Sequence, residues 1–229
     1  MSAYLIDILP IALLGGLLGL DVVGFPQAMI SRPLVAATAG GMLVGHSMSG
    51  MIVGAALELI ALETLPFGAA RYPEWGSAAT VGGVLYARHS ADPAGAMTMA
   101  VLAAVATAWV GGWSMIQLRN VNARAAGRRQ AALDSGARGT VIGLQIGGLS
   151  ADLLRGILLT AVAYAALDPL VTATLGIWDV DGKLSRAMVV GVAAAVALAG
   201  GWKLFHSVPW ARWVFLCGLG VGVLVLVAR

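Results

Sequence analysis

Long runs of apolar residues, separated by short stretches rich in proline, glycine and charge, extend through the whole sequence. An α-helix needs about 20 apolar residues to cross the hydrocarbon core of a membrane. We therefore predict an all-α integral membrane protein with about five full transmembrane helices. The segments expected to form them are residues 4–25, 94–118, 139–167, 187–202 and 208–228.

The first third of the chain, residues 1–90, differs because its apolar segments are interrupted. Pro26 and Pro33 end the first run, since proline lacks the helical N–H donor and restricts the residue before it. Residues 33–57 carry no charged side chain, but glycine and serine cluster near residues 46–49. A split there leaves pieces of about 13 residues, each about 20 Å long, too short for a core of about 30 Å. We predict two half-helices in a re-entrant hairpin, with one long helix as the alternative.

A second break, over residues 65–80, contains two prolines and two glycines. The following run, residues 76–87, is too short to cross a membrane alone. Irregular backbone at membrane depth is tolerated only where protein or a water-filled cavity surrounds it, and transporters build substrate sites from broken helices. We therefore expect residues 1–90 to hold the substrate site.

The densest basic cluster lies between two predicted spans. Residues 119–138 carry five arginines and a single acid, Asp134. The positive-inside rule places such a segment in the cytoplasm, where it orients the protein and attracts anionic membrane lipid; a docking surface for a soluble partner is the alternative. No aromatic side chain is present for base stacking, so nucleic-acid binding is not expected. Residues 139–229 supply the C-terminal helices, and residues 168–186 are expected to form an external loop.

Composition excludes a soluble globular protein. Of the 229 residues, 59% are hydrophobic and 11% charged, with a mean hydropathy of +0.89, whereas soluble domains carry about a quarter charged residues. We expect one polytopic membrane domain over residues 1–229. The single cysteine, Cys217, excludes an intramolecular disulfide and a cysteine-rich metal site. Motifs of hydrolases, kinases and dinucleotide-binding enzymes are missing from the sequence, so we expect no cofactor, no metal and no catalysis by this chain alone.

Glu58 is the most informative ionisable residue in the apolar first third. On a helix, Gly50, Gly54 and Glu58 share one face, and small residues let membrane helices approach closely. A carboxylate at membrane depth is costly and by default marks a function. We predict that Glu58 either accepts hydrogen bonds from a sugar or binds backbone N–H groups freed by a broken helix.

Four further residues lie at the breaks and are candidate substrate ligands: Gln27, Ser31, His46 and Glu74. His46 is better suited to capping a helix than to binding a metal, since no second histidine or cysteine lies at ligand spacing. Glu74 follows a proline, where it either caps a helix or lines a cavity. Asp152 and Arg155 are three residues apart, and we predict that they form an intrahelical ion pair.

The segment "RPLVAATAGGMLVGHSMSGMIVGAALELIALETLPFGAARYPE" resembles the signature region of one membrane protein family. That family is the membrane IIC subunits of sugar phosphotransferase systems, in the mannose/fructose/sorbose group. "LLRGILLT", around Arg155, resembles a later family segment. The matching elements in the signature region are the Arg32–Pro33 pair, Gly45, Gly50, Gly54, Glu58–Leu59, "GAA" at 68–70 and Pro73–Glu74.

The resemblance implies a specific function. Such a permease subunit translocates a hexose or related sugar together with a second membrane subunit, IID. Soluble IIA and IIB domains relay phosphate from phosphoenolpyruvate through phosphohistidines, and phosphorylated IIB modifies the sugar as it enters. The IIC chain carries no phosphohistidine and belongs to an oligomeric, multi-pass complex in the bacterial plasma (inner) membrane. The sugar is expected near the broken helices.

Two departures from the family pattern leave alternatives open. Family members carry glutamine and histidine shortly before the Arg–Pro pair, where this chain has Met29 and Ser31, and Pro66–Phe67 replaces a polar residue before "GAA". A non-transporting regulatory or scaffold remnant is therefore the second hypothesis. The third is a proton-coupled secondary transporter with Glu58 as the proton carrier.

Overall fold

A computed structural model describes residues 2–21, 24–64, 72–90, 93–205, 208 and 210–228. Within these residues the chain is helical and contains no strand. The elements are α1 (Ser2–Leu20), α2 (Pro33–Leu43), α3 (Ser47–Ala61), a 3₁₀ turn η1 (Leu62–Thr64), α4 (Trp75–Arg88), α5 (Pro93–Gly127), α6 (Gln130–Asp134), α7 (Arg138–Leu175), α8 (Gly182–Phe205) and α9 (Ala211–Val227).

The predicted all-α membrane class is confirmed. Among the described residues, three helices are long and apolar enough to cross a membrane: α5, α7 and α8. The remaining apolar helices are shorter. Two of the five segments expected to be full spans, residues 4–25 and 208–228, form α1 and α9, which have 19 and 17 residues.

The predicted break into half-helices is confirmed, and the alternative of one long helix is wrong. Pro33 is the first residue of α2, where its missing N–H has no helical partner to lose. Gly45 separates α2 from α3 with φ of 82°, a left-handed conformation that favours glycine. The two helices then pack closely, since a Cβ atom built on Gly50 would lie 3.0 Å from the Cα atom of Gly41.

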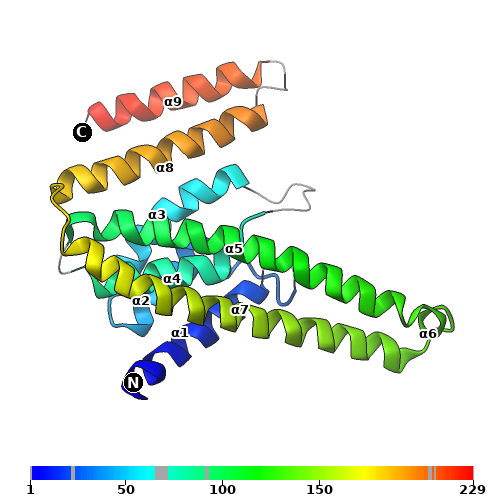
Figure 1. Cartoon of the computed structure of the whole chain (residues 1–229). Coiled ribbons are helices and arrows are strands. Elements are labelled where there is room, and N and C mark those ends of the chain that lie inside the picture. Colours follow the sequence, from blue (N-terminus) through cyan, green and yellow to red (C-terminus); the bar gives the residue numbers. More distant parts are fainter. Residues whose placement is uncertain are drawn as a thin grey trace.

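Helix α4 forms the centre of the bundle. Every residue from Trp75 to Ala87 is buried, because α1, α2, α3, α5 and α7 all pack against this one short helix (Figure 1). Its N-terminus, the end that follows the second break, is therefore surrounded by protein. A polar group at that end can face only other helices or a cavity. Helix α8 covers α3 and α5, and α9 packs against α8 at the edge.

Helices α5 and α7 project together from one end of the bundle and are joined there by α6 (Figure 1). The arginines of residues 119–138 lie on this projecting hairpin. Helix α5 continues to Gly127, beyond the predicted end at 118, because the alanines and arginines of this stretch support a helix outside the apolar core.

The predicted external loop over residues 168–186 is mostly wrong. Helix α7 continues through Pro169 to Leu175, and α8 begins at Gly182. A proline inside a helix removes one backbone hydrogen bond, but α7 is already long before this point and resumes its bonding after it. The loop is thus reduced to residues 176–181.

Candidate functional site

Glu74 occupies the N-cap of α4 and is almost fully buried, at 1% exposure. Its Oε1 atom accepts a hydrogen bond from the backbone N of Ser77 at 3.0 Å, so the predicted helix cap is confirmed. The backbone N of Glu74 donates to the carbonyl of Ala108 in α5 at 2.9 Å. Its second carboxylate oxygen, Oε2, is buried and has no hydrogen-bond partner among the described residues.

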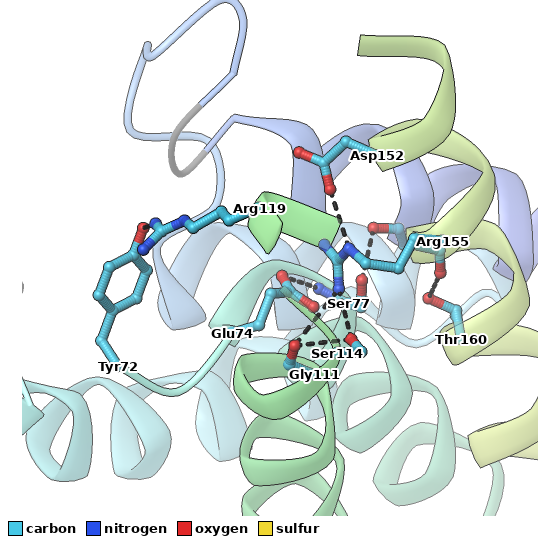
Figure 2. A network of polar contacts seen from close by, with 11 residues as sticks. Tyr72, Glu74, Ser77, Gly111, Ser114, Arg119, Asp152, Arg155 and Thr160 are labelled. Carbon is cyan, nitrogen blue, oxygen red and sulfur yellow. Dashed lines mark hydrogen bonds and ion pairs between the residues drawn. The ribbon is translucent and has the colours of Figure 1, made fainter. Parts of the chain in front are cut away.

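The side chain of Arg155, on α7, points toward Glu74, and the two residues belong to one network of polar contacts (Figure 2). Its Nε atom donates to Asp152 Oδ1 at 2.9 Å, which confirms the predicted intrahelical ion pair. Its Nη1 atom donates to Ser114 Oγ at 3.1 Å and to the Gly111 carbonyl at 3.5 Å. Its Nη2 atom is buried without a partner in the part of the chain that the structure describes. With respect to the described residues, the site therefore holds one unpaired acceptor and one unpaired donor group.

Two glycines let the neighbouring backbones approach this network. A Cβ atom on Gly111 of α5 would lie 2.8 Å from Glu74 Cβ and 3.2 Å from Glu74 Oε2. A Cβ atom on Gly19 of α1 would lie 2.7 Å from Ser77 Oγ and 3.1 Å from Glu74 Oε1. Ser77 Oγ also donates to the Gly15 carbonyl at 3.0 Å. These contacts fix the position of the Glu74 carboxylate, and none of them was predicted from the sequence.

A cavity of about 750 Å³ lies between α5 and α7 and reaches the network at Asp152. Arg119 also lines it. The Arg119 guanidinium donates a hydrogen bond to Tyr72 Oη and lies 5.2 Å from the centroid of the Tyr72 ring, within cation–π distance. The other polar lining residues are Asn122, Arg129 and Gln145.

Glu58 belongs to a different set of contacts. Its Oε1 atom accepts a hydrogen bond from Arg32 Nη2, and its Oε2 atom accepts one from the backbone N of Leu34 at 3.2 Å. Arg32 directly precedes α2, so Glu58 ties α3 to the start of α2 and binds a backbone N–H exposed by the break. These contacts match the structural one of the two interpretations given above.

The first break is organised by Asp21, a residue that was not among the predicted site residues. Its carboxylate is 2% exposed and accepts hydrogen bonds from Ala28 N at 2.6 Å, Ser31 N at 3.0 Å and Ser31 Oγ at 2.9 Å. The Ser31 hydroxyl is therefore already engaged. A lone acid at the end of an apolar run, just before a proline break, is a signal that could have identified Asp21.

His46 and Gln27 are both exposed. His46 stands at the N-cap position of α3, as predicted, and its backbone carbonyl accepts a hydrogen bond from Gly50 N at 3.2 Å, but its side chain makes no capping hydrogen bond. Gln27 lies in the first break with φ of 59°. The predicted site residues are thus distributed over several sets of contacts. Pro66–Phe67 and residues 68–70, which entered the family comparison above, lie outside the described residues.

The model of one protein family, the PTS system sorbose-specific IIC component, matches residues 5–177. The chain belongs to this family. A curated relative, the PTS system sorbose-specific EIIC component of Lacticaseibacillus casei, is 33% identical over 85 residues. That match covers 37% of this chain and 30% of the relative, less than a third of its length. The resemblance noted in the sequence is therefore confirmed, and the chain is a multi-pass membrane protein.

Two solved structures share the fold. One, titled "Structure of membrane protein", is 21% identical with a TM-score of 0.64, covering 100% of this chain and 94% of its own. The other is the mannose transporter ManYZ in complex with microcin E492, determined by cryo-electron microscopy. It is 17% identical to this chain with a TM-score of 0.58, and the match covers 97% of this chain and 87% of the chain in that structure. The chain thus shares its overall fold with these two solved structures.

Proposed function

We propose that this chain is the membrane permease subunit, IIC, of a phosphoenolpyruvate-dependent sugar phosphotransferase system. It translocates a hexose or related sugar, and that sugar binds at the network around Glu74 and Arg155. The family match over residues 5–177 supports membership in a sugar phosphotransferase system. The unpaired Glu74 Oε2 and Arg155 Nη2 atoms support this network as the sugar-binding site.

These two atoms carry the proposal because each is buried and lacks a partner among the described residues. A buried polar atom without a hydrogen bond costs about 1–3 kcal/mol, more when charged. A sugar hydroxyl donates and accepts at once, so neighbouring hydroxyls of one ring can donate to the carboxylate and accept from the guanidinium. A proton or a metal ion would satisfy only the acceptor.

The surrounding residues then have distinct roles. Asp152 and Ser114 hold the Arg155 guanidinium in place, since both bond to it. Glu58, through Arg32 and Leu34 N, orders the α2–α3 hairpin rather than the sugar. Ser31 supports the first break through Asp21. A contact of the sugar with Gln27 or His46, both exposed, stays a prediction.

The partners of the proposed function are a IID membrane subunit and phosphorylated IIB, which is itself charged by IIA. The phosphoryl group passes from a histidine nitrogen of IIB to a sugar hydroxyl oxygen: the P–N bond breaks, the P–O bond forms, and the hydroxyl proton is released. The basic end of the α5–α7 hairpin faces the cytoplasm in this arrangement, where it meets anionic lipid and the soluble domains. The solved relative is a transporter described as ManYZ.

The test is sugar phosphorylation by the chain co-expressed with its IID partner, in vesicles supplied with phosphorylated IIB and a panel of hexoses. Sugar phosphate should form only when both membrane chains are present. Glu74→Gln keeps the shape and removes the charge, and we expect its rate to fall about tenfold or more, as for a lost charged hydrogen bond. Asp179→Asn is the matched control, because Asp179 is an exposed carboxylate in the loop after α7.

Each other result has a defined meaning. A folded, assembled complex that phosphorylates no sugar would favour a regulatory or scaffold remnant. Uptake without phosphorylation that collapses with the proton gradient would favour a secondary transporter. A fully active Glu74→Gln variant would refute the assignment of the sugar to this network, because the unpaired oxygen would then have no substrate to bind.

A further inference from the structure

The cavity between α5 and α7 extends along the hairpin from Asp152, a member of the Glu74–Arg155 network, to Arg129 at the basic end. On α5 its lining extends from Met115 to Ala126, and Arg129 lines it just beyond the end of that helix. At 1.5 Å per residue Met115 and Ala126 are about 17 Å apart. Its inner end is lined by Asp152, which bonds to Arg155. A ligand that has passed Asp152 therefore has space available along the hairpin.

The charges along this cavity change from mixed to positive. At its inner end the carboxylate of Asp152 is paired with Arg155. Further along lie the guanidinium groups of Arg119 and Arg129. Asp152 is the only acid among the described residues that line the cavity, while Asn122 and Gln145 add neutral hydrogen-bonding groups. Arginine is well suited to binding phosphate, because its planar fork of N–H groups matches two phosphate oxygens.

The shape also suits a sugar-sized ligand. A Cβ atom on Gly143 or Gly147 of α7, both of which line the cavity, would meet no atom within 4 Å. The volume of about 750 Å³ falls in the range of small-molecule sites, about 300–1,000 Å³. Tyr72 holds the Arg119 guanidinium on the cavity wall by a hydrogen bond and by its ring.

We propose that this cavity binds the phosphorylated sugar and leads it from the Glu74–Arg155 network toward the cytoplasm, with Arg119 and Arg129 binding its phosphate. The inference rests on the proposed function. A neutral sugar suits the network, where a carboxylate oxygen needs a donor. Once phosphorylated, the same sugar carries two negative charges. The network holds two carboxylates, Glu74 and Asp152, against the one guanidinium of Arg155, whereas the outer cavity presents Arg119 and Arg129. Phosphorylation thereby shifts the preferred position of the ligand outward.

The experiment measures equilibrium binding by calorimetry to the IIC–IID complex in phosphatidylcholine nanodiscs. The probes are mannose 6-phosphate, glucose 6-phosphate and fructose 1-phosphate, the corresponding free sugars, and inorganic phosphate. Arg129→Gln and Arg119→Gln should each weaken sugar-phosphate binding about tenfold and leave free-sugar binding unchanged. Arg124→Gln is the control, because Arg124 is exposed on the same helix and does not line the cavity.

Glu74→Gln should do the opposite, weakening free-sugar binding while sparing sugar-phosphate binding. Sugar phosphates that do not bind, or that bind both arginine variants as tightly as the unaltered complex, would overturn the inference. A second arm repeats the titrations with phosphatidylglycerol nanodiscs and native mass spectrometry. Retained phosphatidylglycerol that is lost in Arg129→Gln and that excludes sugar phosphates would assign the cavity to a lipid headgroup and also overturn it.

Sugar phosphorylation is measured on the same preparations, so the proposed exit path and the proposed permease function can be refuted independently. A complex that phosphorylates sugar normally, while Arg119→Gln and Arg129→Gln leave sugar-phosphate affinity unchanged, refutes the exit path and keeps the permease function. A complex that phosphorylates no sugar refutes the permease function. Because Arg129 is exposed, its substitution should not alter the unfolding midpoint, and Arg119→Gln provides an independent second measurement.

Discussion

Replacing Gly111 with alanine tests how strictly the backbone of α5 positions Glu74. The added Cβ atom would lie 2.8 Å from Glu74 Cβ and 2.9 Å from Leu159 Cδ2. Carbon atoms pack at about 3.5–4.0 Å, so α5 and Glu74 would have to separate by about 0.7 Å or more. Leu159 can rotate away, but Glu74 is held because its backbone N bonds to the Ala108 carbonyl one turn earlier on α5.

The expected cost is that of an overpacked core, about 1–3 kcal/mol. Alanine also gains about 1 kcal/mol of helix propensity over glycine, and this gain must be removed from the comparison. Gly191→Ala in α8 is the matched control, because Gly191 is exposed and helical and its Cβ atom would meet nothing within 4 Å. The difference between the two variants then reports the steric cost alone.

Thermal unfolding of the purified complex measures this difference. At about 2–4 °C per kcal/mol for a chain of this size, Gly111→Ala should unfold about 2–12 °C below Gly191→Ala. Sugar phosphorylation should fall about 10–100-fold, since a shift of about 1 Å in a positioning group has costs of this order. Equal midpoints and equal rates in the two variants would refute the packing argument. A lower unfolding midpoint with full phosphorylation activity would show that the function does not depend on the exact position of Glu74.

Two further predictions concern the α2–α3 hairpin. Gly50→Ala should destabilise the complex by about 1–3 kcal/mol relative to Gly191→Ala, because its Cβ atom would lie 3.0 Å from Gly41 Cα; an unfolding midpoint equal to that of the control would contradict this. Glu58→Gln should cost about 1–3 kcal/mol, between the values for exposed and buried ion pairs, because the Arg32 and Glu58 side chains are 34% and 22% exposed. Glu58→Gln should leave sugar affinity unchanged. Adding Arg32→Gln to the same chain should restore part of the lost stability. Loss of sugar binding in a folded Glu58→Gln complex would contradict the structural role of Glu58.

The features that the sequence predicted correctly depend on neighbouring residues. Pro33 and Gly45 mark the ends of half-helices because proline and glycine act on their own backbone and on adjacent residues. The Asp152–Arg155 pair and the Glu74 cap each span three residues. The helical rise and side-chain spacing are enough to predict such contacts without knowledge of the fold.

The features that it did not predict join distant parts of the chain. Glu58 and Arg32 are 26 positions apart, and Arg155 and Ser114 are 41 positions apart. No local pattern specifies such pairs, because they depend on which helices become neighbours around α4. The continuation of α7 through Pro169 has a related cause: packing and length outweighed a local helix-breaking signal.

The two acidic residues of the broken-helix region show why tertiary contacts decide the function. In the sequence, Glu58 and Glu74 are both carboxylates beside glycine-rich breaks, and Glu58 had the stronger claim because it shares a face with Gly50 and Gly54. In the structure both oxygens of Glu58 accept hydrogen bonds, whereas Glu74 has one buried oxygen without a partner among the described residues. A carboxylate whose bonds are already made gains little from a sugar hydroxyl, since each new bond would replace an existing one. Under the proposed function, the free energy for binding a sugar would therefore come from Glu74 and Arg155, while Glu58 keeps the hairpin in place.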